Sequence, residues 1–521
     1  MGLLRSTAVT GGMTLVSRIT GFLRDVVFAN VFGAGVGTDA FFVAFKIPNF
    51  LRRLFAEGAF AQAFVPILGE YKARRDLAAV RDLISHASGT LAVLLFWLTV
   101  VAVAASPVVV TLFAGGFLLK HPDTFELTTA MLRLTFPYIL FIALTALAGS
   151  VLNTWGRFAV PAVTPVLLNL CLIAAALWLA PHMDQPVMAL AWGVLLAGVV
   201  QLAFQFPALA RQGLLVRPRW GWRHEGVQRI IRLMIPALFG SSVMQINLLL
   251  DTLIASFLVT GSVTWLFYAD RMVEFPLGVF GIALATVILP SLTRSHTRDE
   301  PEAFARTLDW ALRWVILLGV PAAVGLVLLA GPILATLFLH GEFGALDVRM
   351  ASLALMAYGL GLLGFILVKV LAPGYYARQD TRTPVKVGLI AMAVNMTANV
   401  VFVLALLHYE VAGAHMGLAM ATTLSSFVNA LLLFRGLRRQ GVYHARPGWG
   451  RLTGQVGLAA LAMGAFLVVR VGPLADWTAA GIGTRALWLA EAVAGGGLVY
   501  FAVLLATGWR PAMLRRPEPS P

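Results

Sequence analysis

Five basic side chains lie inside the first two hydrophobic segments of the chain, residues 8–32 and 38–68, which have the length and composition of membrane spans. These side chains are Arg18, Arg24, Lys46, Arg52 and Arg53. One Arg or Lys at a helix centre in lipid costs roughly 2.5–3.5 kcal/mol, so five would cost about 12–18 kcal/mol. That exceeds the net stability of most proteins. We therefore expect these groups to face a water-filled cavity inside the protein, and a cationic cavity predicts an anionic substrate.

Other charged residues share this pattern. Asp39, Lys46 and Arg53 are spaced by seven, which places them on one stripe of a helix. A later span, residues 262–292, carries a second charged group. The predicted substrate-binding set is Arg18, Arg24, Asp39, Lys46, Arg52, Arg53, Asp270, Arg271 and Glu274. Because Arg binds phosphate in a bidentate manner, these residues suit a diphosphate that is held and released. The alternative is snorkelling at helix ends combined with structural ion pairs.

Uncharged polar residues mark a second kind of site. Asn247 and Asp251 are four residues apart in one span, and Asn395 and Asn399 are four apart in another. Oxygen ligands with one carboxylate suit a hard monovalent cation or a proton, so Asp251, Asn395 and Asn399 form a predicted ion site. Hydrogen bonding between helices is the alternative, and it is common in membrane bundles.

The composition requires many helices to position these groups. Of 521 residues, 59% are hydrophobic and 12% charged, which indicates an all-α polytopic membrane protein. Cys171 is the one cysteine, which excludes an intrachain disulfide and a Cys-based metal site. Two spans, 38–68 and 262–292, contain a proline and are long enough to tilt or kink. The fourteen predicted spans are 8–32, 38–68, 87–114, 127–152, 158–180, 186–210, 230–259, 262–292, 311–338, 349–376, 384–407, 411–434, 452–472 and 486–508.

The charges of the connecting loops alternate along the chain. Every second loop is rich in Lys and Arg, whereas the loops between them hold only Lys120, Arg349, Arg470 and Arg485. The positive-inside rule then predicts that both termini are cytoplasmic. The net charge of +15 is spread over all the inner loops instead of one module, which argues against nucleic-acid binding.

A weak internal repeat divides the chain. A shift of about 224 residues superposes Gly37 on Gly261 and Lys46 on Asp270, and repeats around a central site are typical of transporters. We predict two six-helix lobes around a central cationic cavity, followed by two extra helices. The predicted segments are 1–212, 213–440 and 441–521.

Several catalytic patterns are missing from the sequence. It contains no H-E-x-x-H motif, no P-loop lysine and no nucleophile elbow in a soluble context. We expect a transporter, not an enzyme, with no bound cofactor. Because the inner loops are too short for a nucleotide-hydrolysing domain, coupling to Na⁺, H⁺ or the membrane potential is expected.

Three stretches resemble a known family. SRITGFLRD at 17–25, TDAFFVAFKIPNFLRRLFAEGAF at 38–60 and VKVLAPGYYARQDTRTP at 368–384 closely resemble the MurJ (MviN) family of bacterial lipid II flippases, within the multidrug/oligosaccharidyl-lipid/polysaccharide exporter superfamily. The resemblance covers essentially the whole chain. It implies a fourteen-helix transporter that moves undecaprenyl-diphosphate-MurNAc-pentapeptide-GlcNAc from the inner to the outer leaflet by alternating access, for peptidoglycan synthesis.

The resemblance also implies roles for particular positions. The matching cavity positions are Arg18, Arg24, Asp39, Arg52, Arg53 and Arg271. Asp251 with Asn395 is similar to a sodium site of the family, but Asn399 stands where a carboxylate is expected. The last two helices resemble those that form a groove for the lipid tail. The implied partners are lipid II, membrane lipids and the cell-wall synthesis machinery, for a monomer in the bacterial inner membrane.

Two other classes compete with this interpretation. Another exporter of the superfamily, for a polysaccharide-linked lipid or for drugs, would have the same fold. A drug antiporter would have fewer buried arginines and usually twelve spans. A membrane-embedded prenyl-phosphate transferase would need clustered acidic residues for Mg²⁺ at a membrane face, and the sequence has none.

Overall fold

The computed structural model describes residues 2–53 and 60–510, with their side chains except those of residues 2–10 and 236–248. All regular elements in these ranges are helical, which confirms the all-α class. The chain divides into two compact units, residues 1–264 and 265–521. The predicted boundary after residue 212 lies earlier in the chain, and it separates α10 from helices on which α10 packs.

Membrane spans account for most of the helices. Eleven of the described helical segments are long and apolar enough to cross a membrane. The three other predicted spans correspond to α1, to α2 with α3, and to α10. Fourteen spans are therefore compatible with the structure. The charged residues of α1 lower its mean hydropathy, and α2 and α3 are each too short to cross a membrane alone.

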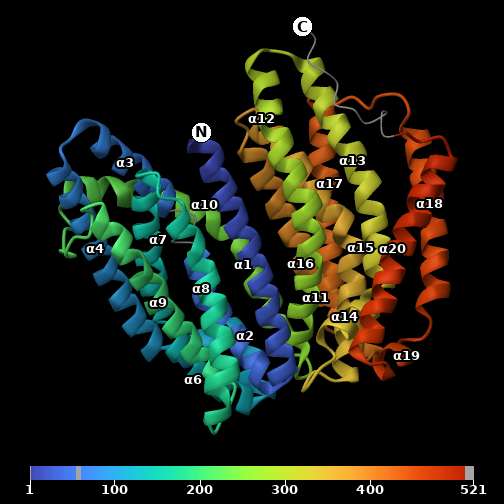
Figure 1. The fold of residues 1–521 in the computed structure, drawn as a ribbon, viewed down its shortest axis with the longest axis horizontal. Helices are drawn as coiled ribbons and strands as arrows, with labels where there is room; N and C mark the ends of the chain where they lie inside the picture. The colour runs from blue at the N-terminus through green and yellow to red at the C-terminus, as the bar shows by residue number, and fades with distance from the viewer. Residues whose placement is uncertain (1, 54–59, 511–521) are drawn as a thin grey trace. The chain divides into compact units, whose positions relative to one another are not determined.

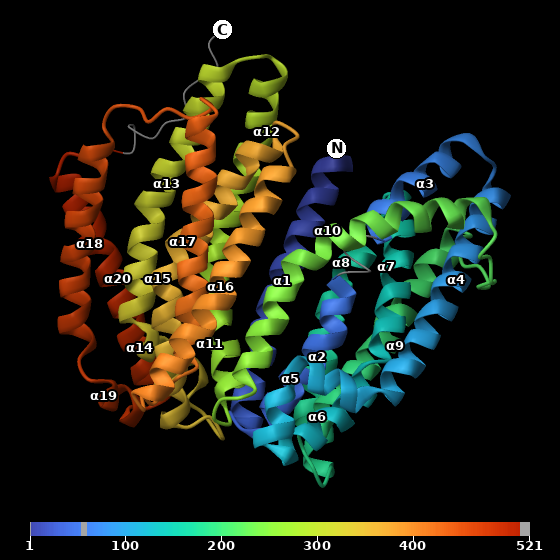
Figure 2. The same ribbon diagram turned by 180° about the vertical axis from the view of Figure 1, so that it is seen from behind.

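The first unit is a bundle in which α1 packs on α8, α7 packs on α9, and α10 runs along α3 and α5 (Figures 1 and 2). Its core is built around the buried Phe64, Leu83 and Val151. Its helices are α1 Gly2–Phe32, α2 Val36–Arg52, α3 Phe60–Arg74, α4 Leu77–Ala104, α5 Ser106–Lys120, α6 Pro122–Thr135, α7 Tyr138–Thr154, α8 Ala159–Ala174, α9 Met188–Arg211 and α10 Glu225–Ala255.

Local sequence sets the helix ends that matter for the site. Gly33 has a φ of 61°, a conformation that glycine adopts without strain, and it ends α1 so that α2 can turn back. At the other side, the carboxylate of Asp76 accepts a hydrogen bond from the N–H of Ala79 and starts α4. A hydrogen bond also links two helices of this unit: Arg229 of α10 donates to Glu70 of α3 at 2.6 Å. This hydrogen bond holds the pKa of Glu70 below its usual value.

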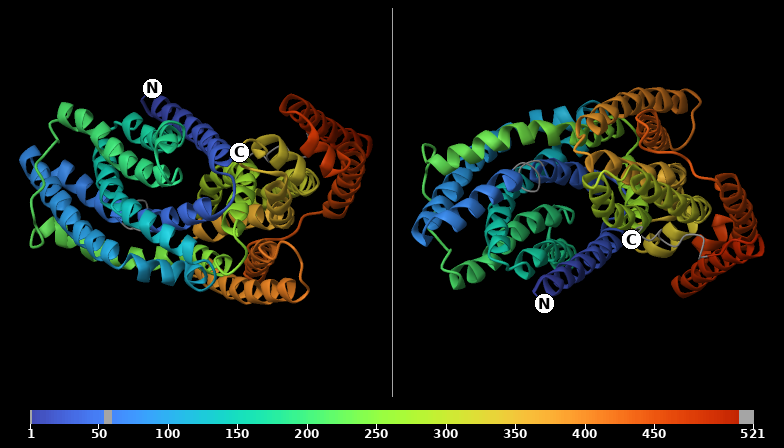
Figure 3. Two further views of the ribbon diagram at one scale, coloured as in Figure 1. Left: turned by 90° about the horizontal axis from the view of Figure 1, so that it is seen from below. Right: turned by 90° about the horizontal axis from the view of Figure 1, so that it is seen from above.

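The second unit is centred on α15, which packs on α13 and α17. The hairpin of α18 and α20, red in Figure 3, packs on α13. Tyr500 of α20 donates its hydroxyl to the carbonyl of Leu317 at 2.7 Å and fixes this contact. The helices are α11 Ser262–Pro276, α12 Ala283–Thr297, α13 Pro301–Leu328, α14 Ala330–Phe338, α15 Ala345–Tyr376, α16 Arg382–His408, α17 Met416–Arg439, α18 Trp449–Val471, α19 Leu474–Ala479 and α20 Ile482–Ala506.

Among the predicted spans after residue 260, two are interrupted in the structure. A π-helical turn, Leu277–Ile282, separates α11 from α12 directly after Pro276, as expected for a proline that removes a backbone donor. The predicted span 311–338 is broken after Leu328, where α14 begins two residues later. Arg485 was placed among outer-loop charges by its sequence, but it is 6% exposed and donates to the carbonyls of Ala335 and Leu339. It therefore caps the C-terminus of α14.

Candidate substrate site

Arg24 of α1 is a buried cation that hydrogen bonds to two other side chains. It is 8% exposed, and its Nε and Nη2 donate to Oδ1 of Asp25 at 3.0 and 2.6 Å. Its Nη1 donates to Oδ1 of Asn169 on α8 at 3.2 Å. The guanidinium also lies 5.7 Å from the centroid of the Phe28 ring. These hydrogen bonds use each nitrogen once, and a guanidinium has five N–H groups, so donors are left for an anion.

Asn169 fixes this arrangement from the neighbouring helix. Its Nδ2 donates to the carbonyl of Ser17 at 3.1 Å and to the hydroxyl of Thr20 at 3.2 Å. The amide oxygen is therefore turned toward Arg24. Arg18, six residues before Arg24, is exposed on α1. The structure thus combines one exposed arginine and one preoriented arginine on the same helix.

The three residues of the predicted stripe on α2 have different surroundings. Asp39 is 2% exposed and accepts from the N–H of Gly261 at 2.6 Å and from the N–H and hydroxyl of Thr264 at 2.9 and 2.6 Å. All of these residues lie in the first unit. Lys46 is partly buried, and Arg53 is exposed at the end of the helix. Asp39 thus serves as a buried acceptor for backbone and hydroxyl donors.

The remaining basic residues of α2 each have a polar contact. Lys46 donates from Nζ to the hydroxyl of Thr252 on α10 at 2.6 Å. Arg52 donates from Nε to Oδ1 of Asn49 at 2.8 Å. Both side chains are partly buried. These two hydrogen bonds lie within the first unit, and the predicted role of both residues toward the substrate stays a prediction.

The predicted charged residues of the second unit lie in the second half of α11. Arg271 forms an ion pair with Glu274 at 2.8 Å, and its guanidinium lies 5.7 Å from the ring of Phe267. Asp270 and Glu274 are exposed. Arg271 and Glu274 are three residues apart on one helix face, a spacing at which opposite charges meet.

The predicted ion-site residues are divided between the units. Asp251 is partly buried on α10 in the first unit. Asn395 and Asn399 are fully buried in the second unit. Asn399 donates to Oδ1 of Asn395 at 3.0 Å, and Asn395 donates to the hydroxyl of Thr422 on α17 at 3.3 Å. The side chain of Asn247 lies outside the described residues. The three-residue ion site therefore stays a prediction, while Asn395 links α16 to α17.

A polar cluster in the second unit escaped the sequence analysis. Asp309 of α13 accepts from the hydroxyl of Tyr443 at 2.9 Å, from Nε1 of Trp449 at 2.7 Å and from Nε of Arg313 at 2.7 Å. Burial and the neighbouring Asp309 raise the pKa of Tyr443 far above its usual value. The spacing of Asp309 and Arg313, four residues apart, could have predicted their ion pair. No sequence pattern points to the distant partners Tyr443 and Trp449. The cluster joins α13 to the segment that leads into α18.

The comparisons with known proteins agree with one another. The family model described as "Lipid II flippase MurJ" matches residues 28–480. A protein of Vibrio cholerae named "Probable lipid II flippase MurJ" is 50% identical over 98% of this chain and 97% of its own length. A protein of Burkholderia cenocepacia named "Lipid II flippase MurJ" is 44% identical over 99% of both chains.

Solved structures show the same likeness. The structure titled "Lipid II flippase MurJ, inward closed conformation" has a TM-score of 0.78 and 26% identity, over 95% of this chain and 98% of the other. An inward-facing multidrug resistance MATE family transporter of the MOP superfamily has a TM-score of 0.66 at 16% identity, over 82% of this chain and 95% of the other. The second likeness shows a shared fold.

Proposed function

Because this chain belongs to the lipid II flippase MurJ family, we propose that the arginines of α1 hold the diphosphate of lipid II during its passage across the membrane. The chain is a multi-pass membrane transporter and not an enzyme. It moves undecaprenyl-diphosphate-MurNAc-pentapeptide-GlcNAc from the inner to the outer leaflet by alternating access, and this movement supplies peptidoglycan synthesis.

The hydrogen-bonded state of Arg24 is the observation that carries this proposal. A guanidinium oriented by Asp25 and Asn169 needs little reorganisation to bind a phosphate oxygen. The adjacent carboxylate offsets part of the positive charge. An anion is then bound firmly enough to be recognised and weakly enough to be released, which a transporter requires. Arg18 and Arg271 are proposed to add charge to the same substrate.

Further features belong to this proposal. Both termini face the cytoplasm, as the loop charges predict. The protein works as a monomer in the inner membrane beside the cell-wall synthesis machinery. The α18–α20 hairpin accommodates the prenyl tail. The cycle is coupled to Na⁺, H⁺ or the membrane potential through Asp251, Asn395 and Asn399. An outward-moving anion gains about 2.3 kcal/mol per charge per 100 mV if it crosses the full field.

Complementation of a strain depleted of its own lipid II flippase tests the proposal. Arg18→Ala, Arg24→Ala and Arg271→Ala should each abolish growth while the protein remains in the membrane. Arg24→Lys should restore growth only in part, because Lys keeps the charge but not the bidentate geometry. Arg298→Ala is the matched control, since Arg298 is exposed after α12.

The location of lipid II distinguishes failed transport from failed folding. Cells that carry an inactive variant should accumulate lipid II in the inner leaflet, at a protein level equal to that of the control. Normal growth with all three Ala variants at native expression would show that these arginines do not hold the diphosphate. Accumulation of a different lipid-linked saccharide would favour another exporter of the superfamily.

A further inference from the structure

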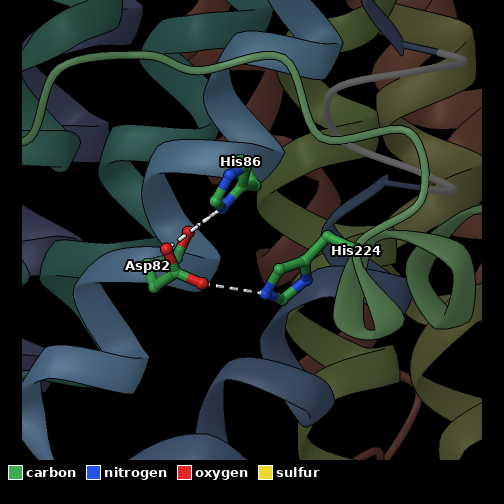
Figure 4. Close-up of side chains that lie close together, drawn as sticks. All are labelled: Asp82, His86 and His224. Atoms are coloured by element: carbon green, nitrogen blue, oxygen red, sulfur yellow. Dashed lines mark hydrogen bonds and ion pairs between the residues drawn. The ribbon is translucent and has the colours of Figure 1, made fainter.

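Three side chains that can bind a metal ion lie close together near the N-terminus of α4. Asp82 and His86 are four residues apart on α4, and His224 directly precedes α10 (Figure 4). One potential ligand atom from each residue lies within 4.8 Å of the others. The two imidazole rings are stacked with centroids 5.0 Å apart, and both present a nitrogen to the carboxylate. None of the three belongs to the predicted substrate or ion sites.

The backbone holds His224 at this place. The segment 214–224 crosses α4, where the N–H of Arg219 donates to the carbonyl of Ser85 at 3.0 Å. The hydroxyl of Ser85 donates to the carbonyl of Arg217 at 2.6 Å. A Cβ at Gly89 would lie 2.1 Å from the carbonyl oxygen of Arg219, so a glycine is required there. The third ligand is therefore supplied by a segment that is fixed on the helix carrying the other two.

We propose that Asp82, His86 and His224 bind one divalent transition-metal ion of the zinc class. Nδ1 of His86 is 3.3 Å from Oδ1 of Asp82, and Nε2 of His224 is 3.2 Å from Oδ2. Two ligands at about 2.0–2.1 Å from a tetrahedral zinc ion lie about 3.3 Å apart. Each N···O separation has the length of one edge of a zinc tetrahedron, but the two nitrogens approach different oxygens of Asp82. The half-exposed carboxylate must therefore turn to place one oxygen against both nitrogens. Two imidazoles and a carboxylate form a common ligand set for zinc.

The proton positions change when the ion binds. In the hydrogen-bonded form, Nε2–H of His224 faces Asp82, and Nδ1 of His224 accepts from the N–H of Gly226 at 3.1 Å. The ion binds the Nε2 lone pair, so the proton of this neutral ring moves to Nδ1. The ring must then turn away from the buried Gly226, whose N–H loses this acceptor at the start of α10. In His86, Nδ1–H donates to the backbone carbonyl of Asp82 at 2.9 Å. The ion replaces this hydrogen bond by taking Nδ1, and the proton moves to Nε2. Each ring keeps one proton and stays neutral.

Partial exposure leaves the site open on one side. The side chains of Asp82, His86 and His224 are 49%, 22% and 19% exposed. A water molecule can therefore complete the tetrahedron, as in sites with three protein ligands. An ion bound there would clamp the start of α10 to α4. This inference does not depend on the transported substrate, because its readout is the binding of metal.

Metal titration of the full chain in detergent, with any affinity tag removed and metal stripped by a chelator, tests the proposal. Zn²⁺ should bind at one equivalent by calorimetry, and Co²⁺ should give the visible absorption of a tetrahedral site. His86→Asn, His224→Asn and Asp82→Asn should each weaken Zn²⁺ binding at least tenfold. His296→Asn, which changes an exposed histidine of the second unit, should bind zinc as the unchanged protein does.

Stability without metal separates binding from folding. The three variants should melt within a few degrees of the unchanged protein in chelator, and only the unchanged protein and the His296 control should be stabilised by added Zn²⁺. Equal zinc binding by all variants would overturn the proposal. The absence of a stoichiometric site in the unchanged protein would also overturn it and leave the cluster as a hydrogen-bonded link.

Discussion

Asp39→Asn separates a role in folding from a role in substrate binding at one residue. The sequence predicts that Asp39 contributes to substrate binding, but the structure shows its carboxylate accepting three hydrogen bonds from Gly261 and Thr264. An asparagine keeps the shape and can keep the two bonds from Thr264 to its oxygen. Its amide nitrogen then faces the N–H of Gly261, and a buried donor loses its acceptor.

The expected loss of stability follows from these contacts. Leaving the buried N–H of Gly261 without an acceptor costs about 1–3 kcal/mol. The two bonds from Thr264 change from charged to neutral acceptance and weaken by about 1 kcal/mol each. These losses amount to about 3–5 kcal/mol, and they are offset in part because a neutral amide costs less to bury than a carboxylate. Asp39→Asn should therefore lower the free energy of unfolding by at most this amount, out of the ~5–15 kcal/mol of a typical protein.

Unfolding in detergent, followed by circular dichroism, measures this loss. Thr264→Val should cost less in the Asp39→Asn background than in the unchanged protein, with a coupling of about 1 kcal/mol if the two side chains act together. Asp184→Asn is the control, because Asp184 is exposed. If Asp39→Asn unfolded within ~0.5 kcal/mol of the unchanged protein but abolished lipid II transport, the structural reasoning would be refuted and a substrate role favoured.

Two further predictions concern charge. Asp251→Asn should slow the transport cycle while lipid II still binds to purified protein, because only a group whose ion affinity differs between states can bias the cycle; full activity with unchanged dependence on Na⁺ and pH would leave the membrane potential as the driver. The hydrogen bond from Arg229 holds the pKa of Glu70 in the folded protein below its ordinary value of 4.5. This bond should therefore stabilise the protein above that pH and lose its effect as the pH falls through the folded pKa. The difference in unfolding free energy between the unchanged protein and Glu70→Gln should vanish in acid, and a difference that persists there would contradict the role of the charge.

The hydropathy of the sequence predicted where membrane helices occur better than it predicted where each helix begins and ends. The predicted spans 349–376 and 384–407 correspond to α15 and α16 within a few residues. The predicted span 311–338 instead covers parts of two helices, because hydropathy does not detect the break after Leu328. The sequence also could not show that α10 packs with the first unit, since the internal repeat places it at the start of the second lobe.

The candidate site shows the same limit for side chains. Residue type and span depth singled out Arg24, and the structure places it among polar groups. Its partner Asn169 lies 145 residues away in sequence, and no local pattern connects the two. His86 and His224 are 138 positions apart by their numbering, so the zinc-class cluster was equally hidden. Pairs within one turn are predictable from spacing, whereas pairs between helices require the fold.

The buried carboxylate of Asp309 has a consequence for the order of assembly during synthesis. Tyr443 follows it by 134 residues and Trp449 by 140. At ~5–20 residues per second, these donors emerge about 7–28 seconds later. Arg313 follows by only four residues and can neutralise the carboxylate during that interval. The helix α13 can therefore enter the membrane as a charge-compensated segment, and attachment of the segment that leads into α18 must be among the last folding events of a nascent chain.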